Sequence, residues 1–187
     1  MNKSIAVLWR RLDMPGHDAC RFAQSKQGWT LRGMAVFLEG KQVCQLRYEV
    51  LADPAFQTRE AVVAGWVGDT VVDLQVCVIG HGMWTVNGVE QPQLAGCVDL
   101  DLGFTPATNF LPVRRLRLRI GEEAQAPAAY LAFPQLRFEV LPQSYKRISE
   151  TKYEYQSPSA GYTGTLEFSP QGVIVSYPGL FSIEGLN

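Results

Sequence analysis

Asp99 and Asp101 are the residues best placed for acid–base chemistry in this 187-residue chain. They flank Leu100, so on a β-strand both carboxylates point to the same face. Paired carboxylates are what glycoside hydrolysis requires. Residues two apart on one strand lie roughly 6.5 Å apart and point in parallel, however, rather than across a substrate. We therefore favour a structural role, facing solvent or nearby arginines, and keep a carbohydrate-active hydrolase or transferase as the alternative.

Other catalytic signatures are missing from the sequence. It has no Gly-x-Ser-x-Gly, no phosphate-binding Gly-x-x-x-x-Gly-Lys and no His-Glu-x-x-His. The two histidines, His17 and His81, lie in loop-like sequence, and His81 stands between two glycines, as is typical of a solvated turn. We expect no catalytic residue, no metal and no cofactor. The cysteines have no zinc-site spacing, and we expect reduced, mostly buried thiols at Cys20, Cys44, Cys77 and Cys97.

A row of arginines follows, in which Arg115, Arg117 and Arg119 alternate with Leu116, Leu118 and Ile120, directly after Arg114. The period of two predicts a strand with three arginines on one face. Neighbouring like charges about 7 Å apart in water repel by only ~0.6 kcal/mol, whereas a dry interior would require partners. The row therefore faces acids such as Asp99 and Asp101, plain solvent, or the mouth of a site for an anionic or sugar headgroup.

The composition restricts the class of protein. Apolar residues make up 47% and charged residues 19%, which excludes a disordered chain. No apolar run approaches the ~20 residues of a membrane-spanning helix. A net charge of -1 provides no attraction to nucleic-acid phosphates. The apolar run that begins at Ile5 ends at Arg10, too short for a secretory signal. We expect one cytoplasmic domain over residues 1–187, its oligomeric state left open.

The segments that contain these candidate residues are predicted to be mostly β-strands. Alternating segments are separated by Gly and Pro throughout, and Asn87-Gly88 is a strong signal for a tight hairpin turn. Thr105-Pro106 offers the start of a short helix. Many short strands predict an all-β sandwich or barrel. The expected strands are 35–38, 43–50, 61–67, 71–79, 84–86, 116–120, 130–133, 136–141, 152–156, 164–168 and 173–177.

Several segments together resemble a bacterial family described as glycolipid-binding. The closest matches are Gly96–Asp101 and Thr105–Leu116, and others run in the same order from Trp9 to Phe181. The resemblance implies a splayed, incompletely closed antiparallel β-barrel with at most one or two short helices. Such a barrel is similar in shape to lipoprotein carriers that hold acyl chains in a hydrophobic groove. The resemblance implies no catalytic residues.

The leading hypothesis is therefore non-enzymatic binding of a glycolipid or similar amphiphile. Burying a twelve-carbon chain gains roughly 10 kcal/mol before ordering costs. We expect Trp66, Trp84 and Phe181 to form the apolar lining. The expected headgroup contacts are Arg115, Arg117, Tyr145 and Tyr153, because tyrosine joins a flat apolar ring to a hydroxyl. The alternatives are a hydrolase using Asp99 and Asp101, or a protein-interaction scaffold.

Overall fold

The computed structural model describes residues 4–80 and 82–187, so that His81, expected in a turn, lies outside the described residues. The strands are β1 (Ser4–Arg11), β2 (Gly16–Ser25), β3 (Gly28–Glu39), β4 (Gln42–Ala52), β5 (Thr58–Val67), β6 (Thr70–Ile79), β7 (Met83–Val86), β8 (Val89–Glu90), β9 (Asp99–Leu102), β10 (Glu123–Gln125), β11 (Ala128–Ala132), β12 (Arg137–Leu141), β13 (Ser144–Arg147), β14 (Lys152–Ser157), β15 (Tyr162–Phe168), β16 (Ile174–Tyr177) and β17 (Phe181–Leu186). One α-helix, α1 (Phe110–Leu116), and the 3-10 helices η1 (Pro92–Leu94), η2 (Ala107–Asn109) and η3 (Pro158–Ala160) complete the described elements.

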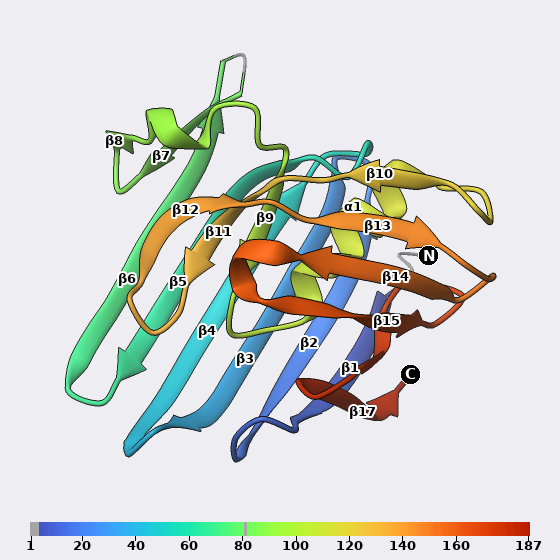
Figure 1. The fold of residues 1–187 in the computed structure, drawn as a ribbon. Helices are drawn as coiled ribbons and strands as arrows, with labels where there is room; N and C mark the ends of the chain where they lie inside the picture. The colour runs from blue at the N-terminus through green and yellow to red at the C-terminus, as the bar shows by residue number, and fades with distance from the viewer. Residues whose placement is uncertain (1–3, 81) are drawn as a thin grey trace.

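A large, strongly curved antiparallel sheet dominates the fold. Its strand order is β10-β13-β14-β15-β16-β17-β1-β2-β3-β4-β5-β6-β7-β8, so the first and last strands of the chain pair near its middle. The long strands β1–β6 form one broad wall, and the shorter C-terminal strands curl over it (Figure 1). The end strands β8 and β10 are not neighbours. The sheet is therefore not closed into a barrel, which confirms the expected all-β, splayed architecture.

A second, three-stranded sheet and the helix occupy the concave side of the large sheet (Figure 1). Its order is β12-β11-β9, and β9 pairs with β11 in parallel, the exception to the antiparallel pattern. Large side chains fill the space between the layers, and Trp9, Phe22, Tyr48, Trp84 and Phe110 are at most 1% exposed. The centre of the fold is thus packed by the protein itself.

The predicted hairpins are present. β3 joins β4, and β5 joins β6, each through a two-residue connection. Asn87 (φ 49°) and Gly88 (φ 78°) form the turn between β7 and β8, because both central positions of such a turn need positive φ. The four cysteines are free thiols, and Cys20, Cys44 and Cys97 are buried, as expected. No helix in the described part of the chain is long and apolar enough to cross a membrane.

The strand predicted for residues 116–120 is wrong. The arginine row begins inside α1 (Phe110–Leu116), whose residues Phe110, Leu111 and Val113 are buried. Burial of these apolar side chains at helical spacing outweighs the alternation that follows them. The predicted start signal is present, because the Thr105 hydroxyl accepts a hydrogen bond from the Ala107 amide (3.1 Å). Arg117 ends the helix in the left-handed conformation (φ 49°).

We expect Gly33→Ala to lower the free energy of unfolding by about 1–3 kcal/mol, as overpacking does. Tyr48 crosses over Gly33, and its hydroxyl donates to Asp18 on the next strand (2.9 Å). A Cβ at position 33 would lie 2.3 Å from the Tyr48 ring. Gly185→Ala is the matched control, since its nearest contact would be Leu8 Cβ at 4.0 Å. Urea unfolding of both variants measures the difference, and equal stabilities would contradict this packing.

Candidate functional site

A groove lies at the end of the fold where β1 and β3 begin and where β2, β4 and β17 end. Its volume is about 820 Å³. We call it the arginine groove, and its lining residues are Ser4, Ile5, Gln24, Ser25, Gly28, Trp29, Pro54, Phe56, Arg114, Arg117, Pro170, Gln171, Leu186 and Asn187. A smaller cavity of about 360 Å³ shares Phe56, Arg114, Arg117 and Pro170 with it. The two cavities therefore flank the same pair of arginines.

One wall of the arginine groove is apolar. Trp29 stacks on Phe56 with ring centroids 5.6 Å apart and an interplanar angle of 26°. Behind them, Phe110 of α1 contacts both rings, with centroid distances of 5.0 Å to Trp29 and 5.9 Å to Phe56. Ile5 and Leu186, from the paired ends of the chain, add aliphatic surface. Trp29 and Phe56 are only 8% and 6% exposed, so most of the wall's open apolar surface comes from Leu186, which is 43% exposed, and from the partly buried Ile5.

Phe56 is held in a conformation that bulky residues rarely adopt. Its φ is 64°, in the left-handed region. Asp53 maintains the loop, because one of its carboxylate oxygens accepts hydrogen bonds from the amides of Ala55 and Gln57, both at 2.9 Å. The Phe56 amide in turn donates to the Asp53 carbonyl (2.9 Å). Strained residues persist where the surroundings fix them, often at binding sites, and here the loop places the Phe56 ring, which is 6% exposed, in the lining of the groove.

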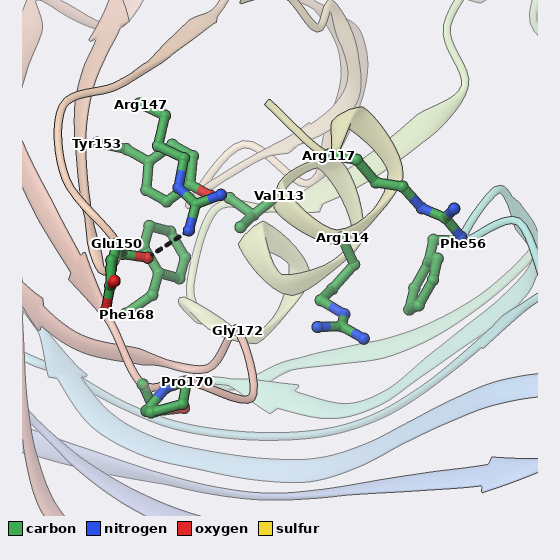
Figure 2. A pocket seen from close by; sticks show the side chains of 11 residues that line it. Phe56, Val113, Arg114, Arg117, Arg147, Glu150, Tyr153, Phe168, Pro170 and Gly172 are labelled. Carbon is green, nitrogen blue, oxygen red and sulfur yellow. Dashed lines mark hydrogen bonds between the residues drawn. The ribbon is translucent and has the colours of Figure 1, made fainter. Parts of the chain in front are cut away.

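Arg114 extends over this ring. Its guanidinium carbon lies 5.4 Å from the Phe56 ring centroid, within the range of cation–π contacts. Its aliphatic stem runs past Gly172, where a Cβ would lie 2.8 Å from Arg114 Cδ. The Nε atom is buried and has no hydrogen-bond partner within the described structure. Arg117 reaches the same region from the end of α1 (Figure 2).

The smaller cavity brings in Arg147 and Tyr153. Arg147 donates to three carbonyls, those of Leu118 (2.9 Å), Ser149 (3.0 Å) and Glu150 (2.7 Å), so it fastens the neighbouring turns together (Figure 2). Tyr153 is 6% exposed and packs edge-on against Phe168. Burial raises the pKa of the Tyr153 hydroxyl, against the opposing effect of the positive charges on Arg147 and Arg114.

Arg115 points elsewhere and binds Asp99. Its Nε and Nη2 atoms lie 3.1 and 2.5 Å from the two Asp99 carboxylate oxygens. Asp99 is 1% exposed, and burial raises its pKa in spite of the adjacent guanidinium. Of the three alternatives for the arginine row, pairing with these acids is therefore found for Arg115 and Asp99. This carboxylate is engaged on both oxygens, which leaves it unsuited to act as a free acid or base.

Asp101 lies on the same strand face as Asp99, as its spacing predicts. It is partly buried beside Tyr130 on β11. Burial, with the nearby Asp99 carboxylate, raises the pKa of Asp101 to about 7. The two carboxylates thus belong to the small sheet, and neither is among the residues lining the two cavities above.

The remaining predicted site residues are distributed over the fold. Trp84 is 1% exposed, and its indole donates to the Cys97 carbonyl (3.0 Å). Tyr145 is fully buried and accepts a hydrogen bond from Asn109 (2.8 Å). Phe181 is buried beside Tyr177 and Arg11. Trp66 is 38% exposed, on the side of β5 opposite to buried Val67.

Of the seven predicted residues, Arg117 lines both cavities and Tyr153 lines the smaller one, which also contains Arg114. Sequence reasoning missed Trp29, Phe56 and Pro170, which come from three distant segments. Arg114 could have been found from the sequence, because it directly precedes the arginine row. Phe56 could not have been found in this way, since its role depends on a left-handed backbone conformation that favours glycine or asparagine in most sequences.

Comparison with known proteins places the chain in a family. No curated protein matches it. A solved structure of a DUF1089 family protein from Pseudomonas aeruginosa is similar, with a TM-score of 0.79 and 28% sequence identity over 88% of this chain and 90% of that chain. Residues 6–182 match the family described as "Putative glycolipid-binding". Because the match spans nearly the whole sequence, the chain belongs to this family.

Proposed function

We propose that the protein binds a glycolipid or a similar amphiphile in the arginine groove and does not transform it. The observation that carries this proposal is the mixed lining of the groove, which combines an apolar wall with polar side chains that we call the polar rim. Trp29, Phe56, Ile5 and Leu186 form the wall. The family to which the chain belongs supports a binding role at the level of its description.

The apolar wall suits an acyl chain. At about 820 Å³, the groove lies in the range of small-molecule sites, which is roughly 300–1,000 Å³. Each methylene that leaves water gains about 0.8 kcal/mol, and part of this gain offsets the loss of motional freedom on binding. A chain of about twelve carbons laid along this wall, chiefly against Leu186 and Ile5, would therefore bind without any reactive group.

The rim suits a sugar. Its uncharged polar side chains are hydroxyls and amides, from Ser4, Gln24, Ser25, Gln171 and Asn187. Such groups both donate and accept hydrogen bonds, as sugar hydroxyls do. No aspartate, glutamate, histidine or cysteine is among the described lining residues of the arginine groove. This supports binding over hydrolysis, because acid–base and nucleophilic catalysis depend on such side chains.

A charged residue on the apolar wall tests the proposal. Leu186 is 43% exposed, so Leu186→Glu should leave the fold intact while placing a carboxylate in the groove. We expect delipidated protein to bind a glycolipid with micromolar or better affinity by calorimetry, and the variant to bind at least tenfold more weakly, since a charge opposes contact with hydrocarbon.

The control is Leu12→Glu, the same substitution at a leucine that is 46% exposed and is not among the groove-lining residues. It should bind as the unmodified protein does. The proposal fails if no member of a panel of neutral, anionic and glycosylated amphiphiles binds, or if the two glutamate variants bind equally well.

A further inference from the structure

We propose that the ligand's headgroup carries an anionic group, a phosphate, sulfate or carboxylate, and that Arg114 and Arg117 hold it. This inference rests on the proposed function, because it names the ligand class of the same groove. Arg114 and Arg117 are the charged side chains among the groove's described lining residues, and both also line the smaller cavity. The smaller cavity also has Arg147 and Glu150 in its lining, and Arg114 and Arg117 are the charged residues that the two cavities share.

The first argument is the contrast between these arginines and their neighbours. Arg115 is paired with Asp99, Arg119 with Glu122, and Arg147 with three carbonyls. No ion pair between described residues involves Arg114 or Arg117. Asp53, next to groove residue Pro54, is bound to Arg59 (2.6 Å). The fold thus provides partners for the surrounding arginines and leaves these two available.

The second argument is the partial burial of Arg114. Its side chain packs between the Phe56 ring and Gly172, and its buried Nε has no hydrogen-bond partner in the described structure. Removing a guanidinium from water without a compensating partner is unfavourable. An anion bound at the exposed part of the group would supply the missing compensation through charge–charge attraction.

The third argument is geometry. Arg114 lies in the last turn of α1 and Arg117 directly follows the helix in the left-handed conformation, and both side chains extend toward Phe56 (Figure 2). Each guanidinium presents a planar fork that matches the oxygens of phosphate, sulfate or carboxylate. Because the apolar wall begins at the same Phe56 ring, one amphiphile can reach both features.

Three ligands with separable features test this inference by calorimetry below micelle-forming concentrations. They are dodecyl phosphate, dodecyl maltoside and inorganic phosphate. We expect dodecyl phosphate to bind at least tenfold more tightly than dodecyl maltoside, with a preference that shrinks as salt screens the charges. Inorganic phosphate should bind at least a hundredfold more weakly than dodecyl phosphate, because it lacks the chain.

The variant is Arg114→Gln/Arg117→Gln, which should lose the preference for dodecyl phosphate, so that the two dodecyl compounds bind with similar affinity. The control, Arg21→Gln/Arg47→Gln, removes two charges from exposed positions on β2 and β4 and should keep the preference. Arg117→Gln alone, at an exposed residue, provides a second variant if the double variant does not fold.

The outcomes separate the two proposals. If neither dodecyl compound binds, the proposed function itself fails. If both bind equally and the arginine variant changes neither affinity, the groove binds amphiphiles but the anionic headgroup is refuted. If inorganic phosphate binds as tightly as dodecyl phosphate, the arginines form a site for a free anion, and the headgroup proposal is overturned.

Discussion

Replacing Arg115 by methionine should lower the free energy of unfolding by about 3–5 kcal/mol at pH 7.5. The reason is the position of Asp99, which is 1% exposed and accepts both hydrogen bonds from this guanidinium. Methionine keeps much of the arginine stem's apolar volume but leaves the carboxylate buried and unpaired. Denaturant unfolding of the variant and the unmodified protein measures the loss.

The loss should be smaller at pH 5. Burial already raises the pKa of Asp99 while Arg115 lowers it, so removing Arg115 raises that pKa further. A group whose pKa is raised in the folded state stabilises the fold when it is protonated, and this contribution is lost as pH rises through the raised pKa. Protonation of Asp99 therefore offsets part of the loss in the Arg115→Met variant at pH 5. Asp99→Asn/Arg115→Met, which removes both charges, should recover most of the stability. A loss below about 1 kcal/mol at both pH values would show that the pair behaves as an exposed ion pair.

The second large effect concerns Asp18, a fully buried carboxylate on β2. It accepts hydrogen bonds from the hydroxyls of Tyr48 and Thr105. Burial raises the pKa of Asp18 to about 6, more than these hydrogen bonds and the nearby Arg11 lower it. The ordinary value is 3.8, so the folded protein binds this proton more tightly than the unfolded chain. The difference corresponds to about 3 kcal/mol.

Asp18→Asn should therefore change how stability depends on pH. The contribution of protonated Asp18 is fully present below about pH 4 and is lost as pH rises through about 6. We expect the stability of the unmodified protein, measured relative to Asp18→Asn by urea unfolding, to fall by about 2 kcal/mol between pH 4 and pH 7, and by about 3 kcal/mol from well below pH 4 to pH 7. Asp69→Asn, in the exposed β5–β6 turn, should reproduce the unmodified profile. A pH-independent difference would contradict the account of Asp18.

The sequence was informative wherever local signals determine the structure. The hairpins β3–β4 and β5–β6 follow from alternating apolar residues, and the Asn87-Gly88 turn follows from two residues that tolerate positive φ. The arginine row led to the wrong prediction of a strand, because alternating Arg and Leu residues also fit the end of a short helix. What decides there is burial of Phe110, Leu111 and Val113, a tertiary effect that overrides a local pattern.

The groove was beyond sequence reasoning for a different reason. Its walls come from chain positions as far apart as Ile5, Trp29, Phe56, Arg114 and Leu186. They meet only because β17 pairs with β1 and the loops at one end of the sheet converge. Two of the aromatic residues predicted to line the site, Trp84 and Phe181, are buried elsewhere in the core and line neither cavity.

A crystal structure of the delipidated protein with a glycolipid whose acyl chain ends in bromine tests the central claim most directly. Anomalous scattering locates the bromine without assumptions about the headgroup. We predict that it lies in the arginine groove, against Trp29, Phe56 and Leu186, with the sugar at the rim. A bromine on the outer sheet beside Trp66, or a groove filled only by solvent at saturating ligand, would contradict the account.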